Sequence, residues 1–222
     1  EKYPLDTLQR VARAQGGYLR TLALFGGHVI SEEADELCTV LQSLDLTAFS
    51  WQECAGDVTV FLDIVADGVL RESSSAALQH LSIGNVNLSD SSMDMLGNLV
   101  PSSLQSLTLF STNIVQVPPF LTRLTTLKML SLGGNTFEHF VLRMPYLEEL
   151  HLCRTTLSLG ATFDLTACTS LRYLDMYASN ARALPLGFDR LTDLRVLDLE
   201  RALIFTRDSE PFFSALAGMH NL

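Results

Sequence analysis

Basic residues are scarce in this chain, and long apolar runs are missing. Lys and Arg total 15 against 25 Asp and Glu among 222 residues, which gives a formal net charge of −10. A surface of that sign repels the phosphate backbone, so we expect no nucleic-acid partner. No uninterrupted apolar stretch reaches the roughly 18 residues that a membrane-spanning helix needs. We therefore expect no membrane insertion.

Cysteine is also sparse, and its four residues are scattered rather than grouped at either end: Cys38, Cys54, Cys153 and Cys168. Thiols distributed in this way are typical of small buried residues in a reducing compartment. We therefore expect an intracellular, cytoplasmic protein. An extracellular location stays open, because residue 1 is Glu and a signal peptide could have been removed.

Leucine, by contrast, recurs with a regular spacing. The pattern Leu-x-x-Leu-x-(Leu/Ile/Met) is followed each time by a further apolar or small residue, and neighbouring copies are for the most part about 20–29 residues apart. In a strand, alternate residues face opposite ways, so positions four and six of each copy point into a core and positions three, five and seven point outward. The pattern opens at Leu19, Leu41, Leu78, Leu104, Leu127, Leu147, Leu171 and Leu194.

These copies resemble the leucine-rich repeat superfamily over about residues 19–204. The resemblance implies an α/β solenoid, with a curved parallel sheet on the concave face and with helices and extended turns on the convex face. We expect a single domain over residues 1–222, in which residues 1–18 form the helix of a preceding repeat or a cap. Because a solenoid needs polar end repeats, we also expect the terminal repeats to continue into further repeats or domains.

The repeats are expected to be of two kinds. Residues 32–41 place apolar side chains on one helical stripe, which resembles the ribonuclease-inhibitor-like class. Pro118-Pro119 and Leu184-Pro185 resemble the shorter typical and plant-type repeats, because proline disfavours a continued helix. The long repeat opening at Leu41 predicts an insertion or a degenerate repeat around residues 51–54.

Position nine of a leucine-rich repeat is normally Asn, whose amide bonds backbone groups of neighbouring turns. Only Asn135 meets that rule. Thr112, Thr155 and Ser179 are expected to do part of the same task through their hydroxyls.

Function is expected at the outward positions, since a fold alone does not specify it. Early repeats carry small residues there, whereas the last three carry charged and aromatic ones. Equivalent residues on adjacent strands lie about 5 Å apart, so His151, Asp175 and Asp198 should form one row, and Cys153, Tyr177 and Glu200 the next. A solvated sheet face is the competing interpretation. The predicted protein-binding residues are Glu149, His151, Arg154, Tyr173, Asp175, Tyr177, Asp198, Glu200, Arg201 and Phe110.

Catalysis is disfavoured. Cys153, His151 and Asp175 superficially supply a nucleophile, a base and an orienting carboxylate, but they lie on a flat, wet face with no implied pocket or oxyanion donor. Metal-ligand spacing and Gly-rich phosphate loops are both missing from the sequence. We therefore expect no enzyme activity, no cofactor and no metal.

The function predicted is protein–protein recognition, in the manner of a scaffold, on the concave face. Two alternatives remain open: a substrate-receptor segment of a ubiquitin ligase or effector enzyme with catalysis outside these residues, and a structural subunit of a large assembly. The identity of the partner is open as well.

Overall fold

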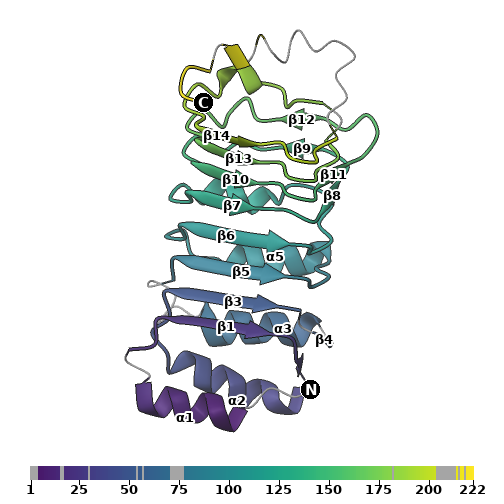
Figure 1. Cartoon of the computed structure of the whole chain (residues 1–222). Helices are drawn as coiled ribbons and strands as arrows, with labels where there is room; N and C mark the ends of the chain where they lie inside the picture. The colour runs from purple at the N-terminus through teal and green to yellow at the C-terminus, as the bar shows by residue number, and fades with distance from the viewer. Residues whose placement is uncertain are drawn as a thin grey trace.

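A parallel sheet of eight strands runs the length of the molecule (Figure 1). The computed structural model describes residues 5–15, 18–29, 31–53, 55–56, 58–70, 78–181, 183–203, 214, 216–217 and 219–222. Neighbouring strands of the sheet follow one another in chain order, one strand per repeat, so the predicted solenoid is confirmed. The strands are β1 (Thr21–Phe25), β3 (Ala48–Gln52), β5 (His80–Gly84), β6 (Ser106–Phe110), β7 (Met129–Ser131), β10 (Glu149–His151), β13 (Tyr173–Asp175) and β14 (Val196–Asp198).

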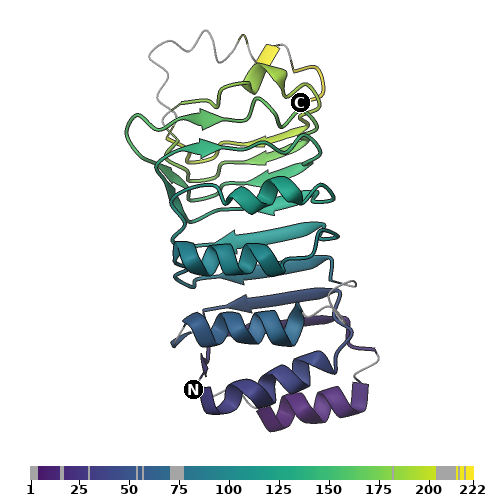
Figure 2. The same cartoon turned by 180° about the vertical axis from the view of Figure 1, so that it is seen from behind.

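Helices cover one face of this sheet in the N-terminal half (Figure 2). They lie on the return path between strands and pack side by side, as the stacking of repeats requires. We call the opposite face of the sheet the open face. The helices are α1 (Leu5–Gln15), α2 (Ser31–Gln42), α3 (Val58–Ile64) with its π-helical continuation η1 (Val65–Val69), and α5 (Asp90–Leu99). A short parallel pair, β2 (His28–Val29) and β4 (Ala55–Gly56), lies beside them.

Helix α5 shows how the sequence specifies these return segments. Ser89 precedes it in an extended conformation, and its Oγ accepts a hydrogen bond from the Ser92 backbone N–H at 3.2 Å. Met93 and Leu96 lie one turn apart and are buried against the sheet.

The return segments change after residue 117, as the proline pair predicted. Pro119 begins a single 3-10 turn, η2 (Pro119–Arg123), in place of an α-helix. Farther on, another 3-10 turn, η3 (Phe188–Arg190), and short strands cover the sheet. These strands form two parallel pairs, β8 (Thr136–Phe137) with β11 (Thr156–Leu157), and β9 (Phe140–Val141) with β12 (Phe163–Asp164).

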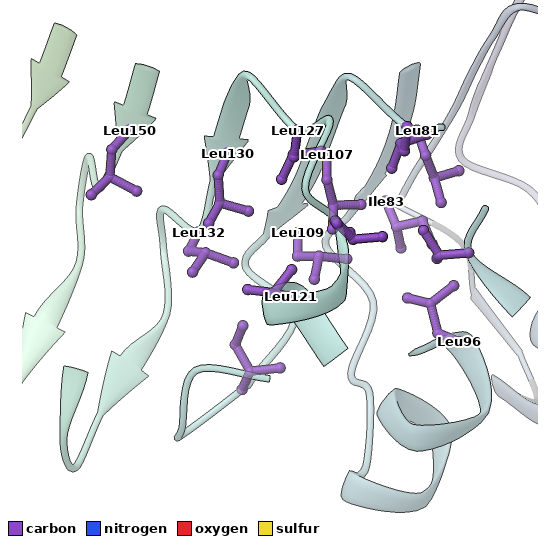
Figure 3. Packing of buried hydrophobic residues seen from close by; sticks show 14 of the residues in the cluster. Leu81, Ile83, Leu96, Leu107, Leu109, Leu121, Leu127, Leu130, Leu132 and Leu150 are labelled. Atoms are coloured by element: carbon purple, nitrogen blue, oxygen red, sulfur yellow. The ribbon is translucent and has the colours of Figure 1, made fainter. Parts of the chain in front are cut away.

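The core lies between the sheet and its return segments (Figure 3). Positions four and six of successive repeats form two columns of buried side chains, such as Leu107 and Leu109 beside Leu130 and Leu132. In the C-terminal half, edge-to-face phenylalanines extend the core. The Phe137 and Phe140 ring centroids are 5.0 Å apart, and those of Phe140 and Phe163 are 5.6 Å apart.

The predicted repeat opening at Leu41 is wrong. Leu41 lies within α2 and Leu44 just after it, and Phe49 and Trp51 pair in register with Leu81 and Ile83. That repeat therefore opens at Leu46, with Phe49 at position four and Trp51 at position six. Helix α2 also presents leucines at intervals of three and four, so its stripe imitated the repeat pattern. Residues 51–52 end a strand and are not an insertion.

Asn135 performs the bridging predicted for position nine. Its Nδ2 donates to the carbonyls of Leu109 at 2.8 Å and Leu132 at 2.9 Å, and its Oδ1 accepts from the Thr112 N–H at 2.9 Å. The predicted substitutes are only partly correct. Thr112 Oγ1 donates to the Leu109 carbonyl at 3.3 Å, but the buried hydroxyls of Thr155 and Ser179 have no hydrogen-bond partner among the described residues. Neither side chain is long enough to span two turns.

Restoring the amide at this position should stabilise the fold. In Ser179→Asn, the new Nδ2 would reach the carbonyls of Leu152 and Met176. These residues occupy position six of the previous repeat and of the same repeat, as Leu109 and Leu132 do for Asn135. The longer side chain would extend along the narrow cavity that Thr155 and Ser179 line. We expect the free energy of unfolding to rise by about 1 kcal/mol, measured by chemical denaturation followed by circular dichroism.

The matched control is Ser179→Ala, which removes an unpaired hydroxyl and should leave stability nearly unchanged. An asparagine variant no more stable than the alanine variant would contradict the proposed bridging geometry.

The residue at position eight of every repeat adopts a positive φ, although glycine supplies only two of them. In all but the last of the described repeats, its N–H donates to the position-seven carbonyl of the next repeat, for example Arg154 to Tyr177 at 2.8 Å and Ala178 to Glu200 at 2.9 Å. The turn geometry is thus imposed by the stacking, at a local cost for side chains that prefer negative φ. These residues are Gly26, Glu53, Asn85, Ser111, Gly134, Arg154, Ala178 and Arg201.

Candidate functional site: the open face of the last three strands

The outward side chains of the sheet change character along the solenoid. Position five is Ala, Ser or Thr in the first five strands, as at Ser82 and Ser131, and then becomes His151, Asp175 and Asp198. The same strands β10, β13 and β14 also carry aromatic and acidic residues at positions three and seven. We call this surface the acidic aromatic patch; its residues are Glu149, His151, Arg154, Tyr173, Asp175, Tyr177, Asp198, Glu200 and Arg201.

The sheet register brings the patch residues into the predicted rows. His151 pairs with Asp175, and Asp175 pairs with Asp198. The next row lies just beyond the strand ends and contains Cys153, Tyr177 and Glu200. There the backbone hydrogen bonds between neighbouring repeats continue, from Arg154 to Tyr177 and from Ala178 to Glu200. The row before contains Glu149, Tyr173 and Val196. The sequence prediction omitted Val196, whose apolar side chain is 46% exposed.

His151 is in contact with three other patch residues. Its Nδ1 is 3.4 Å from Asp175 Oδ2, and its Nε2 is 3.8 Å from Glu149 Oε2. Its ring also lies against Tyr173, with centroids 4.9 Å apart. The imidazole therefore links strands β10 and β13 across the patch.

Asp175 and Asp198 each use one carboxylate oxygen within the chain. Asp175 Oδ1 accepts from the Tyr177 N–H at 2.8 Å, and Asp198 Oδ1 accepts from the Glu200 N–H at 2.8 Å. Bonds of this kind fix the backbone where each strand ends. Oδ2 of each aspartate is thus left for contacts with side chains, as Asp175 Oδ2 makes with His151. The sequence pattern did not reveal this difference between the two oxygens.

Arg201 contacts two other patch residues, Tyr177 and Glu200. Its Nη1 donates to Tyr177 Oη at 3.0 Å, its Nε is 3.6 Å from Glu200 Oε1, and its Cζ lies 5.8 Å from the Tyr177 ring centroid. The guanidinium thus combines an ion pair with a cation–π contact. Arg154 occupies the equivalent turn position two repeats earlier, and it is exposed.

One patch residue, Tyr173, and the adjacent Cys153 have raised pKa values. Burial raises the pKa of the Tyr173 phenol, and the negative charges of Asp175, Asp198 and Glu149 raise it further. Burial and Asp175 likewise raise the pKa of the Cys153 thiol. A nucleophilic cysteine needs the opposite shift, so Cys153 is not activated for catalysis.

Phe110 lies at the border of the patch rather than within it. Its ring and Cys153 approach Gly133 from opposite neighbouring strands, and a Cβ added at Gly133 would lie 2.6 Å from the Cys153 carbonyl oxygen and 3.2 Å from Phe110 Cδ2. Gly133 is therefore required by close packing. The sequence could have indicated this contact, because the repeats on either side of Gly133 carry large side chains, Phe110 and Cys153, at the same position seven.

Metal and membrane chemistry find no support among the described residues. In the part of the chain that the structure covers, no three His, Cys, Asp or Glu side chains are grouped to hold a metal ion. Within the same residues, every helix is too short or too polar to cross a bilayer. Cys54 lies outside the described residues.

Solved structures that resemble this chain are leucine-rich repeat proteins. TLR13, in a complex with ssRNA13, is 22% identical with a TM-score of 0.58 over 90% of this chain. Internalin InlF from Listeria monocytogenes is 17% identical with a TM-score of 0.56 over 89% of it. The ectodomain of the Arabidopsis thaliana membrane receptor kinase GASSHO1/SCHENGEN3, in complex with CASPARIAN STRIP INTEGRITY FACTOR 2, is 19% identical with a TM-score of 0.58 over all of it.

These similarities establish the fold. The chain spans 31%, 63% and 25% of the respective lengths of those three proteins. No protein-family model matches the chain. No curated protein matches it either.

Proposed function

We propose that this leucine-rich repeat solenoid is a non-enzymatic recognition module that binds another protein through the acidic aromatic patch. One observation carries the proposal: three adjacent strands bring carboxylates, tyrosines and a histidine to the open face, while the five preceding strands offer mainly small residues. Tyrosine and arginine provide contact area together with directional bonds, which is why they contribute most at protein interfaces.

The charge of the patch favours a protein over a nucleic acid. TLR13 binds RNA on the same fold, so the fold does not decide between the two classes. In this chain, four carboxylates at outward positions, from Glu149, Asp175, Asp198 and Glu200, would repel phosphate.

An intracellular location is part of the proposal. Cys153 and Cys168 are free thiols. Burial raises the pKa of the Cys168 thiol to about 11, which keeps it protonated and inert. Free thiols of this kind, one buried and one half-buried, are typical of reducing compartments, and fractionation of the source cells tests the assignment.

The patch is tested by replacing its central aromatic residue. We expect Tyr177→Ala to weaken binding of a partner isolated by affinity selection by about 1–3 kcal/mol, because the ring and its bond to Arg201 are both lost. Thermal stability should stay unchanged, since the side chain lies on the open face. Isothermal titration calorimetry and a thermal melt provide the two measurements.

Ser131→Ala is the matched control, because it alters position five of β7, the strand beside the patch, and removes only a small hydroxyl next to His151. It should change neither affinity nor stability. Equal affinities for Tyr177→Ala and the unmutated protein would show that the partner binds elsewhere.

A further inference from the structure

The chain itself shows how the patch holds a guanidinium. Arg201 lies over the Tyr177 ring with an oxygen of Glu200 at 3.6 Å from Nε, so one aromatic face and one carboxylate together hold the cation. This contact is internal to the chain. It identifies the chemistry for which the row of position-seven residues is suited.

The position-three row, on the far side of the His151, Asp175 and Asp198 row, has the same chemistry with no guanidinium over it among the described residues. Tyr173 lies between Glu149 on β10 and Val196 on β14, and Asp175 and Asp198 follow two positions along. The His151 ring covers one side of Tyr173. Asp198 Oδ1 bonds the Glu200 N–H, and its Oδ2 has no hydrogen-bond or ion-pair partner among the described residues.

The distribution of charge points to a cation from outside the chain. No carboxylate occupies an outward position in the first five strands, whereas the last three strands have three, and Glu200 adds a fourth just beyond β14. Arg154 and Arg201 lie on the turns beyond the strand ends, and Arg201 is already held at Tyr177. Arg172 and Arg195 lie just before the strands, and Arg172 is paired with Glu148 at 3.1 Å. The centre of the patch therefore carries a local excess of negative charge, which attracts a positively charged partner group.

We propose that the partner protein inserts an arginine side chain at Tyr173, in the position that corresponds to that of Arg201 at Tyr177. Its guanidinium would stack on the Tyr173 ring and bind the free oxygen of Asp198, and its aliphatic stem would lie on Val196. Arginine fits better than lysine, because its planar group stacks on an aromatic ring and can bind a carboxylate through two N–H groups. This inference rests on the proposed function and names the chemistry of the partner.

A direct test uses a fluorescent hexa-arginine peptide and its hexa-citrulline counterpart, which has nearly the same shape without the charge. Fluorescence anisotropy at low salt should show saturable binding of the arginine peptide only. Asp198→Asn combined with Glu149→Gln should weaken binding at least about fivefold, since charge pairing is the main attraction. The asparagine amide keeps an oxygen that can accept from the Glu200 N–H, so the turn should persist.

Net charge alone could attract such a peptide, so the control variant removes two charges on the other side of the molecule. Asp94→Asn combined with Glu138→Gln gives the same net charge and should bind as the unmutated protein does. Amide chemical-shift changes on adding the peptide should centre on Tyr173 and Val196.

Three outcomes would overturn the inference: equal weakening in both double variants, equal binding of the citrulline peptide, or shift changes away from β13 and β14. Preferential binding of single-stranded RNA would overturn it too. If Tyr177→Ala weakens an isolated partner while the Asp198/Glu149 variant binds that partner normally, the recognition function stands and only the arginine site is wrong. If neither affects it, the proposed function also fails.

Discussion

Trp51→Ala is expected to lower the free energy of unfolding by about 3–5 kcal/mol, the usual cost of truncating a buried aromatic residue. Trp51 occupies position six of its repeat and is 0% exposed. Its ring centroid lies 4.8 Å from that of Phe61 on the covering helix and 6.1 Å from that of Phe49. Alanine would leave a cavity between sheet and helix that these neighbours cannot fill. Urea denaturation followed by circular dichroism measures the loss.

Ser50→Ala is the matched control, because residue 50 is the adjacent position on the open face of the same strand. It should cost less than about 0.5 kcal/mol, as surface substitutions usually do. A comparably small loss for Trp51→Ala would mean that the repeat does not open at Leu46.

Leu174→Ala is expected to cost about 2–5 kcal/mol. Leu174 lies at position four of β13, fully buried, and pairs in register with Leu150 on one side and Leu197 on the other. Removing its side chain opens a gap in the column of leucines that joins three consecutive repeats. Stacking with neighbouring repeats is the principal source of stability in a solenoid, so the effect should reach both neighbours.

Val196→Ala tests whether the face of the sheet toward which a side chain points decides this loss of stability. Val196 neighbours Leu197 but faces outward on the open face. Its truncation should cost well under about 1.5 kcal/mol. Denaturation curves in which the two variants lose equal stability would contradict the assigned inward and outward positions.

Most of the fold could be predicted, because the leucine spacing determines which residues of each repeat face the core. From Leu78 onward every predicted opening agrees with the observed register. The prediction failed at Leu41, where an amphipathic helix and a strand both present apolar residues and one sequence does not distinguish them. Pro118-Pro119 correctly marked the change of return segment, because proline acts on the backbone of its own residue and the one before.

The candidate site was predictable only as rows of residues. Strand periodicity placed His151, Asp175 and Asp198 side by side, since it determines which residues share a face. It did not show that one oxygen of each aspartate bonds the backbone or that Arg201 lies on Tyr177, because turns and rotamers decide those contacts. The unpaired hydroxyls of Thr155 and Ser179 were unpredictable for the same reason: hydrogen bonding at position nine depends on side-chain reach.

The fluorescence of the buried Trp51 reports on only one half of the molecule. This residue is the only tryptophan in the chain, and it lies where helices cover the sheet. Its emission therefore reports the opening of the N-terminal repeats, whereas circular dichroism averages over the whole chain. In a solenoid, each repeat contacts mainly its neighbours, so the two signals need not change together. Coincident fluorescence and circular dichroism curves would show that the N-terminal half, covered by helices, and the C-terminal half, covered by short strands, unfold together. Separated curves would show that the two halves are weakly coupled.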